Sequence, residues 1–248
     1  MDRLYIKEFC VSQKISRKSY VSALPVVLAM QRIGPFKLSK QVTFFVGENG
    51  SGKSTLLEAL AVSSGMNAEG GSRNFTFSTK ATESDLHQYL SIAKSAYEKD
   101  SFFLRAESFY NVASNIEDLD ATPAAAPKIS DGYGGKSLHD QSHGESFLAL
   151  VQHRFHGNGL YILDEPEAAL SPTRQMSLLI EIDRLVKQHS QLIISTHSPI
   201  VMAYPDAEIY EIKDGNITLT EYEKTSHYQI TKQFLDNPQK MLRLLLND

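Results

Sequence analysis

An eight-residue glycine-rich segment constrains this chain more than any other feature of its sequence. Residues 47–54 read Gly-Glu-Asn-Gly-Ser-Gly-Lys-Ser and fit the pattern G-x-x-x-x-G-K-[ST] without a mismatch. The β-rich run Val42–Val46 comes directly before them, and Ser54–Ser63 follows with leucines at helical spacing. A strand, a glycine loop and a helix in this order predict a phosphate-binding loop, whereas a chance turn of glycine and serine rarely has both neighbours.

The residue types in this loop suit a nucleotide phosphate chain. Glycines let successive backbone N–H groups turn toward one anionic point, and the helix N-terminus adds its dipole. We expect Lys53 to reach the β and γ phosphates and the Ser54 hydroxyl to bind Mg²⁺. The candidate nucleotide-binding residues are Gly47, Glu48, Asn49, Gly50, Ser51, Gly52, Lys53, Ser54 and Thr55.

Two adjacent acids follow a later apolar strand, Leu160–Leu163. The carboxyl ends of strands in α/β sheets face the crevice where ligands bind. We expect Asp164 to hold Mg²⁺ through water and Glu165 to orient and deprotonate an attacking water. The alternative is an ordinary strand end with two solvated acids, which becomes less plausible beside an intact phosphate-binding loop.

A histidine follows the next predicted strand, Leu192–Ser195. His197 lies in the run Ser-Thr-His-Ser-Pro, where its ring can donate a hydrogen bond to a γ-phosphate oxygen. A lone histidine in a loop is more often an ordinary polar residue. Its position after a strand, like that of Glu165, favours the functional interpretation.

Strands that alternate with helices predict an α/β fold with a mostly parallel central sheet and helices on both faces. We also expect an antiparallel β portion near the N-terminus. The predicted strands are Leu4–Val11, Val42–Val46, Phe102–Arg105, Leu160–Leu163, Leu192–Ser195 and a hairpin over Glu208–Thr220. The predicted helices are Ser54–Ser63, Ser84–Tyr97, a segment from Phe147 to Phe155, Pro172–Gln188 and two in the tail, while Val26–Ile33 suits a short helix or a strand.

The alternation is interrupted between residues 65 and 156. Gly65–Thr82 predicts a loop or an edge hairpin, and Ala121–Gly135 predicts a loop because it is rich in proline, alanine and glycine. We therefore expect one domain over 1–248, with a nucleotide-binding core over 1–64 and 157–248. The segment 65–156 is predicted to be an inserted, mainly helical lobe.

Four motifs in sequence order carry a family resemblance. Asp164–Ser171 resembles the Walker B motif and D-loop of ABC-type ATPases, and His197 resembles their switch histidine. Ser142–Ser146 resembles their signature motif, usually written LSGGQ. Ser142 and Gly144 match that motif, whereas Gln141, His143 and Glu145 stand where leucine, glycine and glutamine are usual. With the loop at 47–54, the chain is identified as a member of the ABC-type P-loop ATPases.

The resemblance implies ATP and Mg²⁺ as cofactors, ATP hydrolysis, and a head-to-tail homodimer that sandwiches two ATP molecules. In such a dimer the signature residues, Ser142, His143, Gly144 and Glu145, touch the nucleotide bound by the opposite subunit. The chain also departs from the family pattern. Ser171 stands where the D-loop usually has an aspartate, and no clear Q-loop glutamine is present.

The divergent signature resembles that of the soluble SMC-like and DNA-repair ATPases more than that of transporter subunits. No heptad pattern fills the gap between Ser54 and Ser142, so the chain resembles a stand-alone head without a coiled coil, similar to small bacterial predicted ATPases of the AAA type. The resemblance implies a soluble ATP-driven switch for a separately encoded partner. The alternatives are the ATPase subunit of a membrane transporter and a DNA-repair or DNA-end-processing ATPase.

Composition bears on these alternatives. The net charge of −4 disfavours a dedicated nucleic-acid binder, although a local basic patch is compatible with it. Cys10 is the only cysteine, which suits a reducing compartment, and no apolar run approaches the length of about 20 residues needed to cross a bilayer. We therefore expect a cytoplasmic protein without direct membrane insertion.

Overall fold

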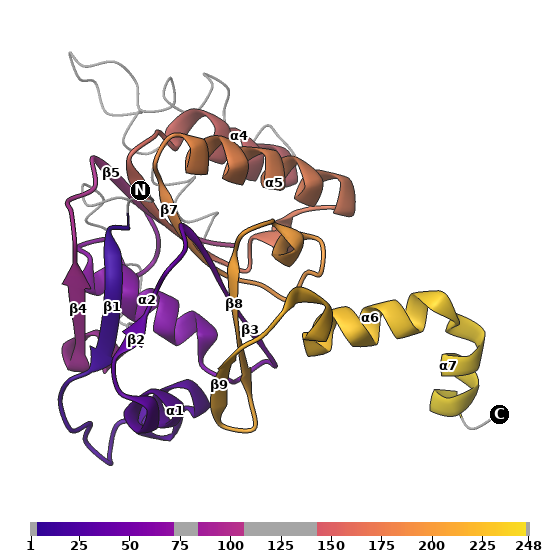
Figure 1. Ribbon diagram of the computed structural model, residues 1–248, viewed down its shortest axis with the longest axis horizontal. Coiled ribbons are helices and arrows are strands. Elements are labelled where there is room, and N and C mark those ends of the chain that lie inside the picture. The colour runs from indigo at the N-terminus through magenta and orange to yellow at the C-terminus, as the bar shows by residue number, and fades with distance from the viewer. Residues whose placement is uncertain (1–3, 72–83, 107–142, 247–248) are drawn as a thin grey trace.

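The computed structural model describes residues 4–71, 84–106 and 143–246. Its main feature is a six-stranded sheet in the order β5-β6-β7-β3-β8-β9 (Figure 1). Neighbouring strands are parallel except β8 and β9, which are antiparallel. The strands are β3 (Val42–Gly47), β5 (Asp100–Arg105), β6 (Gly159–Asp164), β7 (Gln191–Ser195), β8 (Glu208–Lys213) and β9 (Asn216–Leu219). The predicted α/β fold with a mostly parallel sheet is confirmed.

A second, smaller sheet has the order β2-β1-β4 and is antiparallel throughout. It consists of β1 (Ile6–Val11), β2 (Phe36–Lys37) and β4 (Leu90–Lys94). The predicted antiparallel N-terminal portion is therefore present, and it also contains β4, which lies much later in the chain.

The helix predicted over Ser84–Tyr97 is wrong. This segment forms a short 3-10 helix, Asp85–Tyr89, and then strand β4. Leu86 and Leu90 are buried, but Tyr97 is 82% exposed, so these three residues do not share one buried face. Because β1 offers a complete backbone partner, pairing in the small sheet outweighs the local helical spacing.

Part of the predicted helical lobe also belongs to the sheets. Strand β5 pairs with β6 from Asp100 opposite Gly159 to Arg105 opposite Asp164. Residues 90–105 therefore supply one strand to each sheet, and the mainly helical character predicted for 65–156 does not hold there. Helix α4 (His143–Arg154) agrees with the prediction.

Helices cover both faces of the central sheet (Figure 1). Helix α2 (Lys53–Ser63) lies between the central and the small sheet, and α1 (Pro25–Ile33) packs into the same apolar cluster. Helices α4 and α5 (Pro172–Lys187) pack on each other and cover the opposite face. Strands β3, β6 and β7 are buried along their whole length, as expected for parallel strands between two helical layers.

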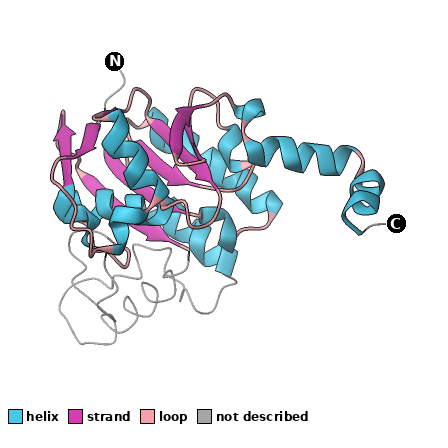
Figure 2. Cartoon of the chain, turned by 90° about the horizontal axis from the view of Figure 1, so that it is seen from below, coloured by secondary structure: helices cyan, strands magenta, loops and turns pink. Residues whose placement is uncertain are grey.

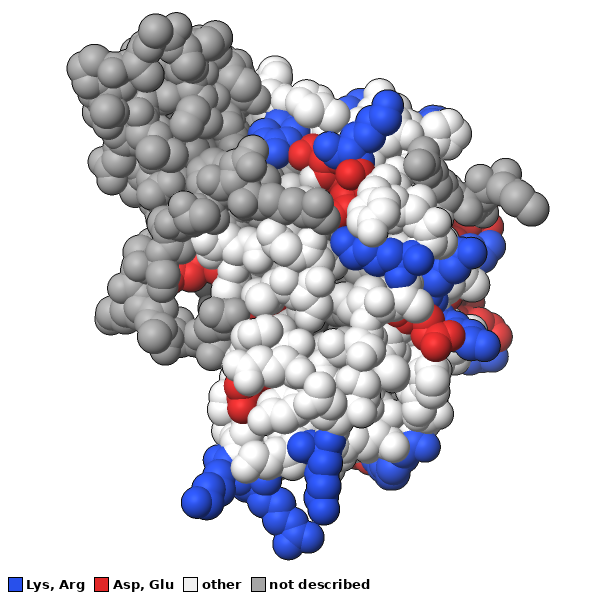
Figure 3. Space-filling view, turned by 90° about the vertical axis from the view of Figure 1, so that its left-hand side faces the viewer, with Lys and Arg blue, Asp and Glu red and all other residues white. Residues whose placement is uncertain are grey.

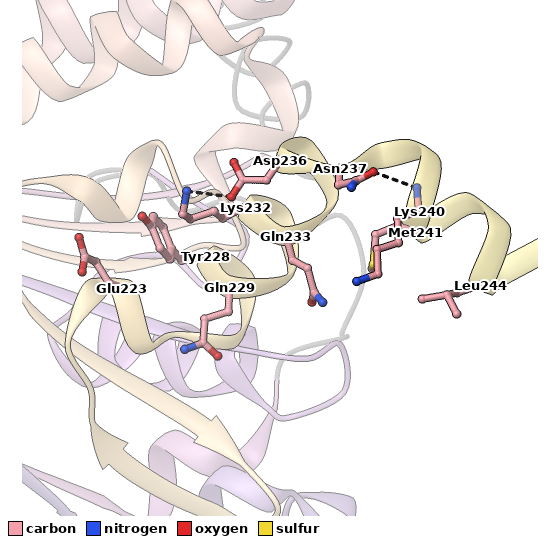
Figure 4. Close-up of a pocket in the computed structure, with 10 residues that line it drawn as sticks. All are labelled: Glu223, Tyr228, Gln229, Lys232, Gln233, Asp236, Asn237, Lys240, Met241 and Leu244. Carbon is pink, nitrogen blue, oxygen red and sulfur yellow. Dashed lines mark hydrogen bonds and ion pairs between the residues drawn. The ribbon is translucent and has the colours of Figure 1, made fainter.

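The last two helices, α6 (Ser226–Asp236) and α7 (Pro238–Leu246), project away from the body as a C-terminal arm (Figures 1 and 2). They break at Asn237-Pro238, as the sequence predicts. Neither helix has a buried side chain. Side chains of α6 and α7 line a groove of about 630 Å³, to which Tyr228, Lys232 and Met241 contribute (Figure 4).

Two surface properties bear on possible partners. Among the described residues, no helix has the length and apolar character that spanning a membrane requires. The loop 12–19, at the lower end of the molecule in Figure 1, exposes Lys14, Arg17 and Lys18. Figure 3 shows basic side chains gathered at that end, so the net negative charge is unevenly distributed.

Candidate functional site

The loop 47–54 needs glycine at defined positions. Gly47 has φ +145°, and a Cβ there would collide with the backbone oxygen of Ile212 on β8. Gly52 has φ +94°, and its Cβ would lie 2.6 Å from Val26 Cγ1. Because L side chains rarely adopt these φ values, the loop conformation requires glycine. The loop then leads directly into α2, whose N-terminus begins at Lys53.

A pocket of about 260 Å³ opens against this loop. Asn49, Gly50, Gly52, Lys53, Ser54 and Thr55 line it together with Leu24 and Glu165. Glu165 lies on the loop after β6, over a hundred residues away in sequence. The structure therefore brings six of the nine predicted nucleotide-binding residues and the predicted water-activating glutamate to one cavity, whereas Gly47, Glu48 and Ser51 do not line it.

The Lys53 ammonium lies inside the loop. Its Nζ donates hydrogen bonds to the carbonyl oxygens of Gly47, at 2.7 Å, and Glu48, at 3.1 Å, and the residue is only 4% exposed. Burial lowers the pKa of Lys53, and the nearby carboxylates of Glu165 and Asp164 oppose that shift. The result is a cation held at the loop with few water contacts, which suits a phosphate ligand.

Asp164 ends β6 beside the loop. Its Oδ1 accepts a hydrogen bond from Ser195 Oγ at 2.5 Å, and the Ser54 side chain is near enough to influence the pKa of its carboxyl. Burial raises the pKa of Asp164, while Ser195, Arg105 and Ser54 counteract the shift. Carboxylate and hydroxyl oxygens are ligands that Mg²⁺ accepts. The adjacency of Ser54 and Asp164 therefore fits the predicted magnesium site.

Glu165 and His197 face each other. The Glu165 Oε1 and His197 Nε2 atoms lie 3.2 Å apart. Glu165 has φ +51°, a left-handed conformation that non-glycine residues seldom adopt, and its N–H donates to the Ser195 carbonyl at 3.1 Å. Such strain often marks functional positions, and here it directs the Glu165 side chain into the pocket. The two residues predicted as catalytic are thus neighbours.

Sequence reasoning missed Glu167 as part of this site. Its Oε1 accepts a hydrogen bond from the His197 backbone N–H at 2.5 Å. Burial raises the pKa of Glu167, and the His197 N–H counteracts the shift. The contact fixes the backbone that carries the histidine. The acid stands two residues after Glu165, so the local Asp-Glu-Pro-Glu run held a signal for it.

Sequence reasoning also missed His227, which lies outside the four motifs recognised in the sequence. Its Nε2 lies 3.2 Å from His197 Nδ1 and 3.5 Å from the Gly47 carbonyl oxygen. The two imidazole rings are nearly perpendicular, with centroids 4.8 Å apart. Burial has the largest effect on the pKa of His197 and lowers it, and the Lys53 ammonium lowers it further. No local sequence pattern pointed to His227, because it lies thirty positions after its partner.

Arg105 is a third residue that the sequence did not mark. Its Nη1 lies 2.9 Å from Glu58 Oε2 on α2, and its Nε lies 3.4 Å from Asp164 Oδ2. The Arg105 side chain is 22% exposed, whereas the two carboxylate side chains are 9% and 6% exposed. One guanidinium therefore joins β5, β6 and the helix that follows the phosphate-binding loop. The available signal was a basic residue at the end of the strand predicted over Phe102–Arg105.

Replacing Arg105 with methionine is expected to destabilise the fold. The change leaves two buried carboxylates without their cation, which costs about 3 kcal/mol of unfolding free energy. For a chain of this length that loss lowers the melting temperature by roughly 6–12 °C. Thermal unfolding measures it, with Arg243→Met on the exposed face of α7 as a matched control. Equal melting temperatures for the two variants would show that the Arg105 network contributes nothing to stability.

The candidate signature residues are only partly within the described structure. Ser142 lies outside the described residues, and His143 begins α4. A Cβ on Gly144 would lie 2.8 Å from the Ala169 carbonyl oxygen, and Glu145 pairs with Arg174 of α5 at 2.8 Å. Within the described residues, Gly144 and Glu145 thus contact their own chain near Ala169 and Arg174. They do not line the pocket at the phosphate-binding loop.

Ser171 has a local structural role. Its side chain accepts a hydrogen bond from the Arg174 backbone N–H and caps the N-terminus of α5. Pro172 occupies the first helical position, which suits its fixed φ. The serine that replaces the usual D-loop aspartate therefore starts a helix.

Fold and site together define a class of protein. Strand β3, a glycine loop, helix α2 and the acids at the end of β6 have the arrangement of the nucleotide site in P-loop ATPase domains. Comparison with family models agrees: an "AAA domain" model matches residues 31–122, and the model described as "AAA domain, putative AbiEii toxin, Type IV TA system" matches residues 137–203.

Similar proteins narrow the class. The chain is 27% identical over 179 residues to the ABC multidrug transporter A-1 of Aspergillus fumigatus, covering 66% of this chain and 12% of that protein. It is 28% identical over 233 residues to a Rhizobium etli protein named "Putative ribose/galactose/methyl galactoside import ATP-binding protein 1", covering 84% of this chain and 44% of that one. The chain thus spans less than half the length of these relatives.

A solved structure shares the fold. A nucleotide-free ATP-binding cassette from an ABC transporter superposes with a TM-score of 0.50 at 16% identity, covering 95% of this chain and 97% of the cassette. The chain is therefore similar to P-loop ATPases of the ABC type, in its fold and in the two regions that the AAA-domain models match. Its predicted place among the SMC-like and DNA-repair branch stays a prediction.

Proposed function

We propose that this chain binds ATP with Mg²⁺ and hydrolyses it. One observation carries the proposal: Lys53, Ser54 and Glu165 line one pocket although they come from distant parts of the chain. Asp164 precedes Glu165 in the chain, and His197 contacts the Glu165 carboxylate. Each supplies a group that phosphoryl transfer to water requires, namely a cation, metal ligands, a base and a hydrogen-bond donor.

Each of these residues would have a separate role in the reaction. Lys53 and the loop N–H groups hold the β and γ phosphates. Ser54 and Asp164 would hold Mg²⁺, which neutralises charge on the phosphates when bound. Glu165 accepts a proton from a water whose oxygen bonds to the γ-phosphorus. The bond from that phosphorus to the β–γ bridging oxygen breaks, and ADP and phosphate leave.

We further propose that two copies complete the site. The family resemblance implies that Ser142, His143, Gly144 and Glu145 act on the nucleotide of the opposite subunit. The position of Gly144 and Glu145 against Ala169 and Arg174, away from the pocket of their own chain, supports this arrangement. ATP would then close a head-to-tail homodimer, and hydrolysis would open it.

The output of this cycle is proposed to be a switch that a separately encoded partner reads. The relatives named above are a transporter and an import ATP-binding protein, so service as the ATPase subunit of a transporter is the second candidate. A DNA-related role is the third hypothesis, because loop 12–19 exposes basic residues that could contact a phosphate backbone. DNA stimulation of the ATPase that falls with added salt would favour that third role.

Phosphate release from ATP tests the proposal. The wild-type protein is expected to release phosphate only with Mg²⁺, and excess chelator should abolish the reaction. Because two chains complete each site, activity per chain should rise with protein concentration until the dimer is saturated. An absence of Mg²⁺-dependent release at any concentration would refute hydrolysis, and activity per chain that is constant across a wide dilution series would refute the composite site.

A further inference from the structure

The base of the C-terminal arm is fixed on the nucleotide-binding core. Thr225 is fully buried, and its side chain accepts a hydrogen bond from the Tyr228 N–H at 3.4 Å, which caps α6. The Ser226 N–H donates to Glu211 Oε1 on β8 at 2.8 Å. These contacts hold the first turn of α6 in place. The next residue, His227, is therefore presented at a defined position, with its ring against His197.

The hydrogen-bonding capacity of the neighbours determines which nitrogen carries the proton. An ionised Glu165 carboxylate can only accept, so His197 Nε2, at 3.2 Å, must be the donor to it. Burial and the Lys53 ammonium lower the pKa of His197, which favours a neutral ring. In a neutral imidazole with a proton on Nε2, Nδ1 is an acceptor.

The partner of that acceptor is His227. Its Nε2 lies 3.2 Å from His197 Nδ1, so the proton between them belongs to His227 Nε2. The Gly47 carbonyl oxygen, at 3.5 Å from the same nitrogen, is a second acceptor and agrees with this assignment. The opposite arrangement, with a proton on His197 Nδ1, would point the Nε2 lone pair of a neutral ring at a carboxylate oxygen.

We propose that His227 is a positioning residue for ATP hydrolysis: its Nε2–H donates to His197 Nδ1 and fixes the His197 tautomer that presents Nε2–H to Glu165 and the γ-phosphate. This inference rests on the proposed hydrolytic function. Because His227 belongs to α6, the same hydrogen bond joins the hydrolytic centre to the base of the C-terminal arm. The arm and its groove (Figure 4) are thus connected to His197, which contacts the proposed general base Glu165.

Two substitutions at this position separate hydrogen bonding from packing. His227→Phe keeps a ring but removes the N–H donor, whereas His227→Gln places an amide N–H at the position of imidazole Nε2. Partners that fix the orientation and tautomer of a histidine are worth about 10- to 100-fold in function at metal sites, and we expect a similar loss here. The phenylalanine variant should lose this factor in kcat with KM for ATP within about threefold, since Lys53 and the other residues of the phosphate-binding loop are unchanged.

The glutamine variant should recover most of that rate, while His153→Phe on the exposed surface of α4 serves as a matched control and should retain wild-type kcat. A kcat for His227→Phe equal to that of the wild type would overturn the proposal. So would equal losses in the phenylalanine and glutamine variants, because that pattern indicates packing alone.

A spectroscopic measurement is independent of turnover. Long-range ¹H–¹⁵N correlation spectra of the imidazoles report which ring nitrogen is protonated. In the wild-type protein without nucleotide, His197 should carry its proton on Nε2, and the tautomers should become mixed in His227→Phe but not in His227→Gln. An unchanged His197 tautomer in the phenylalanine variant would refute the role of His227 even if ATP is hydrolysed. The expected change in a protein that fails to hydrolyse ATP would instead refute only the proposed hydrolysis.

Discussion

Replacing Glu165 with glutamine is expected to lower the rate of ATP hydrolysis by about 10²- to 10⁴-fold, the usual contribution of a general base. Glutamine has nearly the same shape, and its amide oxygen can still accept from His197 Nε2, which lies 3.2 Å from Glu165 Oε1. The amide, however, cannot take a proton from the attacking water. The loop and Lys53 are unchanged, so ATP affinity should stay within a few-fold of the wild type.

Single-turnover phosphate release and equilibrium binding of a fluorescent ATP analogue measure the two quantities separately. Glu221→Gln is a matched control, because it makes the same chemical change on an exposed side chain. Among the described contacts, the Glu221 carboxylate pairs only with Lys224. A Glu165→Gln protein that turns over ATP at the wild-type rate would remove Glu165 from the chemical step. The acid would then be assigned a structural role at the strained turn after β6.

Replacing Lys53 with alanine is expected to weaken ATP binding by about 10- to 100-fold, since a hydrogen bond to a charged group contributes roughly 1.5–3 kcal/mol. The Nζ atom already lies among the loop carbonyls of Gly47 and Glu48, so a small displacement would bring it to bound phosphates. The nearby carboxylates of Asp164 and Glu165 would then repel the nucleotide without a compensating cation.

Isothermal titration calorimetry measures this loss, and thermal unfolding checks that the variant is folded. Lys187→Ala is the control, because that lysine is 74% exposed on α5. A folded Lys53→Ala protein with wild-type ATP affinity would contradict the assignment of residues 47–54 as a phosphate-binding loop.

The central parts of the site were predictable because they lie at the ends of parallel strands. Gly47, Asp164 and Ser195 end β3, β6 and β7, which are neighbours in the sheet in the order β6-β7-β3. Each strand is a short apolar run that the sequence reveals, and the functional residues follow directly. The carboxyl ends of parallel strands share one edge of the sheet, so positions after these runs, together with the motif resemblance, led to the prediction that Lys53, Glu165 and His197 belong to one site.

The residues that support them were not predictable by the same reasoning. Arg105 is recognisable only once β5 is known to pair with β6 in the register that puts it opposite Asp164. His227 is recognisable only once α6 is known to begin beside Gly47. Both contacts depend on tertiary geometry, which spacing along the chain does not encode.

Strand β4 shows the limit of periodicity more directly. Leu86, Leu90 and Ala93 have helical spacing, and nothing local excludes a helix. The backbone nevertheless pairs with β1 and closes the small sheet over α2, because β1 would otherwise have a free edge. The competing requirement comes from a strand some eighty residues earlier, outside any local window.

The central claim is that two chains complete each ATP site. The mass of the Glu165→Gln protein in solution tests this claim most directly. With slow hydrolysis, ATP and Mg²⁺ should hold the closed state long enough to be resolved by size-exclusion chromatography with light scattering. We predict a monomer of 27.7 kDa without nucleotide and twice that mass with ATP and Mg²⁺. A Glu165→Gln protein that binds ATP to saturation and still elutes as a monomer would contradict the sandwiched dimer.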